Sequence, residues 1–442
     1  MNATWRCTLA ATALIALALG SRSAFGLFVS PINTATGIGL AGISLAVAIG
    51  QLVQGVAQPV VGVLADRYGA ARVIALGLVL FAVGNAATIV SGDALAFGTA
   101  VVFTAAAATA MSSIAVLLAE VGRRVPPARQ VLAIGIVGAG GSLGQMLLGP
   151  GTQAVIDAAG WQAALWSTAG LALLALPLAL VFRRGAGVPA AAQAAAGGDG
   201  PDRSEALAAR EDGTRHVARR ERHPGVAGAL RSRDFWLIGA GFAACGMHIA
   251  FLNLHMPGVI DGCGLPAGLS GVWLAVLGAA NIAGALGIGM VLRRHAPAAA
   301  LLVLHGLRGA AIAAFLLLPT TPLALLAFAV AMGLTYMAIL PPTTMLVQRV
   351  FGPARFASIF GCIMLLHQAG CFVGVWLGGL AGEWNDPAAG YRAFWMVDVA
   401  LSLLAAAAHL PFLLGRRRPL AARPGARPAP RSAGGARPAL AA

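Results

Sequence analysis

The chain has 442 residues, of which 59% are hydrophobic and only 10% are charged. Because a soluble domain carries roughly a quarter charged residues, this composition excludes an ordinary soluble protein and indicates a polytopic membrane protein. The formal net charge of +15 comes from arginines that fall between apolar runs. Arginine in that position is a membrane-topology signal, and without basic residues interleaved with aromatic ones it does not predict nucleic-acid binding.

The sequence lacks the patterns that would indicate an enzyme. Its cysteines have neither metal-ligand spacing nor the arrangement of a disulfide framework. We find no Ser-His-Asp order around a strained nucleophile turn and no phosphate-binding Gly-Lys loop. The sequence therefore predicts no catalytic activity, no ATP hydrolysis, no metal and no cofactor.

Apolar runs of about 20 residues, the length that crosses a hydrocarbon core, recur along the whole chain. The first starts after Arg6 and resumes at Phe25, so we interpret it as a membrane helix rather than a cleaved signal peptide. We predict an all-α fold of twelve transmembrane helices in two six-helix halves. The expected spans lie near 7–29, 41–62, 72–91, 95–119, 130–151 and 161–182, and near 235–256, 267–292, 299–318, 322–346, 356–381 and 391–414.

This pattern divides the chain into four parts. Residues 1–182 and 235–414 are the two halves, 183–234 is a cytoplasmic linker, and 415–442 is a disordered cytoplasmic tail. The linker is rich in Ala, Gly and Arg and has no apolar periodicity, which predicts a solvated tether. A short amphipathic helix near 203–222 lying on anionic lipid is the alternative.

Basic residues mark alternate loops. By the positive-inside rule, these loops and both termini are cytoplasmic, as an even number of spans requires. We therefore expect a multi-pass protein of the inner membrane. The arginines that carry the signal are Arg67, Arg72, Arg123, Arg124, Arg129, Arg293, Arg294, Arg349 and Arg355.

The two halves repeat one another at a nearly constant offset. The segment 127–129, Pro-Ala-Arg, recurs at 353–355, and Gly144 then falls on Gly370. One residue of shift relates Gln54 to Asn281. Such matches in corresponding spans are the pattern that duplicated transporter halves leave.

A tight turn joins the second and third spans, with Gly62, Asp66, Arg67 and Gly69 in the pattern Gly-x-x-x-Asp-Arg-x-Gly and Arg72 three residues further on. This turn resembles the cytoplasmic loop signature of the major facilitator superfamily. The resemblance implies that these residues form a latch between the halves on the cytoplasmic side. It also implies that the third, sixth, ninth and twelfth spans mostly lie outside a central cavity.

Ionisable residues at membrane depth usually face a cavity or a partner. Arg22 lies near the middle of the first span, and in the repeat register its neighbour Ser21 corresponds to His248. We expect Arg22 and His248 to face each other across the pseudo-two-fold axis, where transporters of this build bind substrate. The alternatives are that Arg22 reaches the outer interface and that His248 is hydrogen-bonded inside the bundle.

Other polar residues in the spans extend this candidate site. Gln51, Gln54 and Gln58 share one helix face; Gln51 is the best placed to line the cavity, and Gln58 to bond a neighbouring helix. Arg308, one turn after His305, has a structural or coupling role. The remaining candidates are Asn281, Tyr336, His367 and Gln368, and a histidine such as His367 can titrate near physiological pH and take part in proton coupling.

The segment 22–28 in the first span, His367-Gln368-Ala369-Gly370 and Gly378-Gly379 resemble the monocarboxylate transporter and oxalate:formate antiporter group. The resemblance implies a small organic anion, often moved with protons. We therefore expect a monomeric secondary active transporter with Arg22 as the countercharge, because arginine binds a carboxylate bidentately. The alternatives are an exporter of an apolar or cationic compound and a non-transporting membrane sensor or polytopic enzyme.

Overall fold

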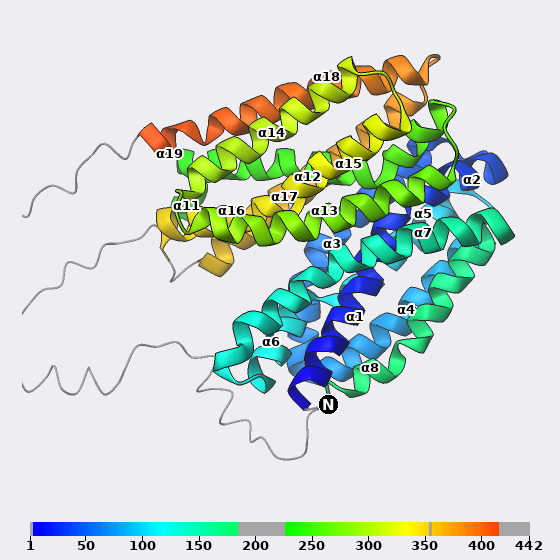
Figure 1. Ribbon diagram of the computed structural model, residues 1–442. Coiled ribbons are helices and arrows are strands. Elements are labelled where there is room, and N and C mark those ends of the chain that lie inside the picture. The colour runs from blue at the N-terminus through cyan, green and yellow to red at the C-terminus, as the bar shows by residue number, and fades with distance from the viewer. Residues whose placement is uncertain (1–2, 184–225, 353–355, 415–442) are drawn as a thin grey trace, which may run out of the picture.

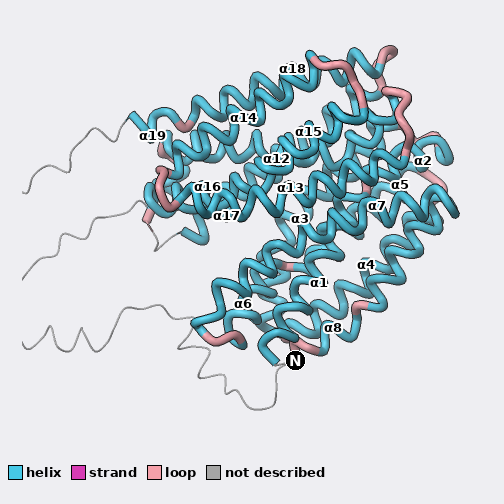
Figure 2. Tube along the Cα trace, viewed as in Figure 1, coloured by secondary structure: helices cyan, strands magenta, loops and turns pink. Residues whose placement is uncertain are grey.

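A computed structural model describes residues 3–183, 226–352 and 356–414, and within these ranges every regular element is a helix (Figures 1 and 2). The predicted linker helix near 203–222, the repeat at 353–355 and the tail 415–442 lie outside the described residues. The all-α prediction is confirmed.

The helices form two groups along the chain (Figure 1). The first half holds α1 (Ala3–Ala24), α2 (Gly26–Thr36), α3 (Leu40–Tyr68), α4 (Ala70–Val90), α5 (Ala94–Ser112), α6 (Ile114–Arg124), α7 (Pro127–Leu174) and α8 (Leu176–Leu180). The second half holds α11 (Val226–Leu230), α12 (Arg233–Gly262), α13 (Gly268–Leu292), α14 (Pro297–Leu317), α15 (Pro322–Tyr336), η1 (Met337–Ile339), α16 (Leu340–Phe351), α17 (Phe356–Gly382), α18 (Pro387–Ala408) and α19 (Leu410–Leu414).

Among the described residues, 11 helical stretches are long and apolar enough to cross a membrane. One of these stretches contains α7, which comprises both the fifth and the sixth predicted spans. The two spans meet at a kink at Gly160, where the backbone leaves the helical conformation with φ 84° and ψ 170°. A side chain is disfavoured in that backbone conformation, so glycine is required there. The predicted first span is interrupted at Phe25, which separates α1 from α2.

Within each half, a glycine brings two helices into backbone contact. A Cβ added at Gly144 of α7 would lie 1.9 Å from the carbonyl oxygen of Ala16 in α1, and one added at Gly370 of α17 would lie 1.9 Å from that of Ala243 in α12. The offset that relates Ala16 to Ala243 also relates Ser21 to His248. The packing therefore follows the repeat register read from the sequence, and small residues allow the close approach.

The two halves converge at one face of the molecule and diverge at the other (Figure 1). We call the diverging face, where the N-terminal end of the chain and the helices α8, α11 and α19 lie, the terminal face, and the opposite one the closed face. At the closed face, the Glu383 carboxylate accepts a hydrogen bond of 2.9 Å from the Ala41 backbone N–H at the start of α3.

Contacts between the halves continue from the closed face to the middle of the molecule. Along α3 and α17 they run from Ser44 against Gly379 to Gly55 against Gln368. Nearer the terminal face, a Cβ added at Gly62 of α3 would have no atom within 4 Å. The halves thus pack at one end and leave space between them at the other.

We predict that Gly144→Ala lowers thermal stability, because the added methyl group would overlap the Ala16 carbonyl and overpacking costs about 1–3 kcal/mol. Gly135→Ala is the matched control on the same helix, since a Cβ there meets open space. The melting temperatures of the purified proteins in detergent check this. Equal melting temperatures for both variants would contradict the packing.

Candidate functional site

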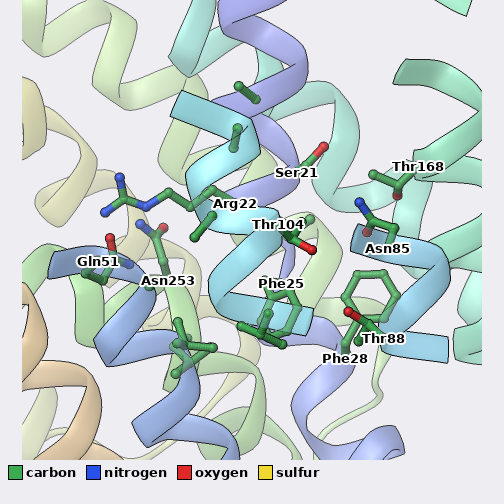
Figure 3. A pocket seen from close by; sticks show the side chains of 18 of the residues that line it. Ser21, Arg22, Phe25, Phe28, Gln51, Asn85, Thr88, Thr104, Thr168 and Asn253 are labelled. Atoms are coloured by element: carbon green, nitrogen blue, oxygen red, sulfur yellow. The ribbon is translucent and has the colours of Figure 1, made fainter. Parts of the chain in front are cut away.

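A cavity lies where helices of the first half meet α12 and α17 of the second, and it offers about 90 Å³ to the centres of water-sized molecules. Aromatic side chains from α2 and α4 line it together with polar groups (Figure 3). The polar lining residues are Ser21, Arg22, Gln51, Gln54, Asn85, Thr88, Thr104, Thr152, Thr168 and Asn253. The lining therefore contains one charged side chain, and that charge is positive.

Arg22 lies in the last turn of α1, just before the break at Phe25. Its half-buried side chain extends to the same side of the cavity as Gln51 and Asn253 (Figure 3). No carboxylate of the described residues lies within ion-pair distance of it, and its polar neighbour is the Cys371 thiol. A cation in low dielectric without a countercharge is costly, which favours a negatively charged ligand beside it.

Two further polar atoms in the cavity wall have no hydrogen-bond partner among the described residues. They are the side-chain oxygen of Gln51, whose residue is only 6% exposed, and the hydroxyl of Ser21. Buried polar atoms usually have a hydrogen-bond partner. Two such atoms without a partner beside a cavity therefore indicate that they hydrogen-bond to a ligand or to water. The Gln51 backbone carbonyl is occupied, accepting a 2.9 Å bond from the Gln368 amide.

Gln54 and Gln58 have different environments although they share a helix face with Gln51. Gln54 lines the cavity. Gln58 accepts a 3.3 Å hydrogen bond from the Ser113 hydroxyl, so it has the helix-to-helix contact expected for it.

A network of three buried side chains joins the halves beside the cavity. The Gln145 amide donates to the Asn253 side-chain oxygen at 3.1 Å, and the Asn253 amide donates to the Tyr336 hydroxyl at 2.6 Å. The sequence predicts Tyr336 as a site residue, but Gln145 and Asn253 were not among the predicted site residues. Each is a strongly polar residue inside a predicted span, and that signal could have identified it.

The cavity extends further into the first half than expected. Asn85 and Thr88 of α4 and Thr168 of α7 line its far side (Figure 3), although the family resemblance implied that the third and sixth spans lie outside it. Thr88 and Thr168 donate to carbonyls of their own helices. Their hydroxyl oxygens therefore remain available as acceptors.

The structure corrects the expected position of His248. Its ring is fully buried and does not line the cavity; Nε2 lies 2.8 Å from Oδ1 of Asp398 in α18 and 3.1 Å from the Ser402 hydroxyl. His248 therefore does not face Arg22, because its side chain leaves α12 toward α18. Arg308 is fully buried as well, and its Nη1 lies 3.4 Å from the other ring nitrogen of His248.

The remaining candidates lie between helices outside the cavity lining. Asn281 donates to the Ser142 hydroxyl at 2.8 Å and accepts from the Met337 backbone N–H at 3.0 Å, so it joins the halves. His367 packs against Phe242, with ring centroids 4.5 Å apart. Its Nδ1 lies 3.4 Å from the Gln368 side-chain oxygen.

The turn between α3 and α4 lies at the terminal face. Gly69 is a one-residue junction at φ 90° and ψ 141°, where glycine is required. Asp66, Arg67 and Arg72 are exposed, and Asp66 has no ion-pair partner among the described residues. The turn is built as the sequence predicts, but the halves do not meet at it in this conformation.

Comparison with known proteins agrees with the fold. Residues 11–375 match the family model described as Major Facilitator Superfamily, and the chain belongs to that family. It is therefore a multi-pass membrane protein with the fold of a small-molecule transporter. No curated protein matches the chain.

Three solved structures illustrate the likeness in fold. The chain is 14% identical to the nucleoside transporter NupG (TM-score 0.69, covering 93% of this chain and 99% of that one). It is 13% identical to a D-xylose-proton symporter (TM-score 0.69, 93% and 98%). It is 16% identical to a bacterial homologue of the human lysosomal transporter Spinster in an inward-facing, occupied conformation (TM-score 0.69, 92% and 96%).

We predict that Asn253→Ala lowers stability by about 1–3 kcal/mol, because it leaves the buried Gln145 amide and the Tyr336 hydroxyl without their partner. Thr343→Ala is the control, since the Thr343 hydroxyl bonds only a carbonyl of the preceding turn, that of Ile339. Denaturation of both variants measures the difference. A loss no larger for Asn253→Ala than for Thr343→Ala would show that the network does not hold the halves together.

Proposed function

We propose that this protein is a secondary active transporter that moves a small organic anion across the inner membrane, in symport with protons. The observation that carries this proposal is Arg22, a cation in the cavity wall with no carboxylate partner among the described residues. A monocarboxylate is the simplest ligand that neutralises it, because the guanidinium fork matches both carboxylate oxygens.

Neighbouring groups define what else such a ligand should carry. The unsatisfied Gln51 side-chain oxygen accepts a hydrogen bond. An anion with a hydroxyl or N–H group near its carboxylate would therefore bind Arg22 and Gln51 together. Phe25, Phe28 and Phe81 line the same cavity and provide apolar contact for the rest of the ligand.

The alternatives have less support in the cavity. A cationic compound needs an acidic partner, and no Asp or Glu is among the described lining residues. Asp398, an acidic residue in the last predicted span, lies against His248. A sensor without transport would have no use for an unpaired charge in a cavity between the two halves.

The transport cycle follows from the two faces of the molecule. The arginine-rich loops lie at the terminal face, which the positive-inside rule assigns to the cytoplasm; this conformation is then inward-open, with both termini cytoplasmic. Return to an outward-open state requires the halves to meet at the turn that holds Asp66.

One chain supplies the whole cavity and both faces, so we propose a monomer as the working unit.

Arg22→Gln should reduce uptake of a carboxylate into proteoliposomes at least about tenfold, since an ionic contact is replaced by a neutral one. Arg392→Gln is the control, because that arginine is exposed at the start of α18. A panel of labelled carboxylates identifies the best substrate first. Wild-type uptake of none of them, or equal uptake by both variants, would refute the proposal.

Replacing Asp66 with Ala should slow transport of any substrate severalfold while leaving equilibrium binding unchanged, because Asp66 lies far from the cavity and acts when the halves meet. Uptake rates and binding of the same labelled carboxylate in detergent separate the two effects. Loss of binding in proportion to loss of transport would contradict a latch.

A further inference from the structure

The second half contains a cluster of ionisable residues that the anion site does not use. Arg308 of α14, His248 of α12 and Asp398 of α18 are each fully buried. Arg308 Nη1 lies 3.4 Å from His248 Nδ1, and His248 Nε2 lies 2.8 Å from Asp398 Oδ1. The three side chains thus form a line with a permanent cation at one end and a carboxylate at the other.

The chemistry of arginine determines which nitrogen of the ring carries the proton. Arg308 can only donate, so His248 Nδ1 accepts and the ring proton sits on Nε2, facing Asp398. A second proton on the ring would place an N–H against the guanidinium and add a like charge. This leaves the carboxylate as the place for a further proton, and neither of its two oxygens has a hydrogen-bond partner among the described residues.

In the repeat register, this cluster corresponds in position to the part of the first half that lines the cavity. One residue offset relates Ser21 to His248, Phe81 to Arg308 and Ala108 to Thr335. Ser21, Phe81 and Ala108 all line the cavity, whereas their counterparts surround or form the ionic line. The first half therefore offers space for a ligand, and the second half fills the equivalent space with polar and ionisable side chains.

Other titratable side chains face the cluster from the packed helices. His305, one turn before Arg308, is fully buried and stacks on His409 of the last helices, with ring centroids 5.5 Å apart. His367 of α17 lies within electrostatic reach of both Arg308 and Arg22. Asp398 is the acidic member of this group, so Arg308 depends on it for charge balance.

We propose that Asp398 binds the coupled proton, with Arg308 and His248 as positioning residues; this rests on the proposed anion–proton symport. Hydronium transfers its proton to the Oδ2 lone pair: one O–H bond of hydronium breaks as the new O–H bond forms, a water molecule is released, and the carboxylate becomes a neutral acid. Arg308 then loses its countercharge, so the ionic line that ties α12, α14 and α18 together is weakened.

A continuous set of contacts connects this event to the anion cavity. Arg308 Nη2 donates a 2.7 Å hydrogen bond to the Thr335 carbonyl, immediately before the helix break at Met337–Ile339. The next residue, Tyr336, bonds Asn253 in the cavity wall. Movement of Arg308 on protonation therefore displaces the break and, through Tyr336, one wall of the substrate site.

The test compares two transport modes in proteoliposomes containing the best labelled carboxylate. Exchange of labelled for unlabelled carboxylate needs no net proton movement, whereas accumulation driven by an inward proton gradient does. Asp398→Asn should keep exchange within about threefold of wild type and lose accumulation about tenfold or more. Ser402→Ala, which removes a neutral neighbour of His248, should retain both. Accumulation by Asp398→Asn at the wild-type level would overturn the proposal.

Asp398→Asn leaves Arg308 buried without a countercharge and so endangers folding. The double variant Asp398→Asn with Arg308→Met removes both charges and is the second test, with the same expected loss of accumulation. Wild-type accumulation by this double variant would also overturn the proposal.

Infrared spectroscopy of the substrate-free protein tests the proton site independently of the anion. The carboxylic-acid band of Asp398 should appear as the pH is lowered and be missing from Asp398→Asn. A wild-type protein without that band has a fixed ion pair and no proton site there. If the band titrates but no carboxylate is exchanged, the anion assignment fails and the proton site stands.

Discussion

A charge held at membrane depth has to be neutralised, and the two deeply placed arginines of this protein meet that requirement differently. Arg308 lies in line with Asp398 through His248 and also donates to a backbone carbonyl. Arg22 lies in the cavity wall with no carboxylate among the described residues in reach. The paired arginine is part of the protein's own framework, and we propose that a ligand supplies the countercharge of the unpaired one.

The framework that positions these charges is built from close helix contacts. Gly144 against Ala16 and Gly370 against Ala243 repeat the same backbone approach in both halves, and in lipid such contacts replace the hydrophobic driving force of a soluble core. Each of these contacts is local to one half. Other contacts join the halves, including the hydrogen bond that Glu383 accepts at the closed face.

The sequence predicted the all-α fold and the twelve spans well because apolar runs of membrane length are a strong signal. Its boundaries were less reliable. The first predicted span is divided into α1 and α2 at Phe25, whose backbone conformation is itself helical, and Gly160 alone separates the fifth span from the sixth. Neither junction changes the hydropathy profile.

The candidate site was predictable only in part. The repeat register related His248 to Ser21, but position along a helix does not fix the direction of a side chain. The His248 side chain was expected to face Arg22. It instead leaves a different side of α12 and contacts Asp398. Asn85 and Thr168 were missed because single polar residues in supporting spans look like ordinary helix-packing groups.

The most direct test is a crystal structure of the protein with its best carboxylate bound. We predict that both carboxylate oxygens lie within hydrogen-bond distance of the Arg22 guanidinium, that Gln51 contacts the same ligand, and that Asp398 remains beside His248. A ligand bound elsewhere, with Arg22 paired to a carboxylate of the protein itself, would contradict this prediction.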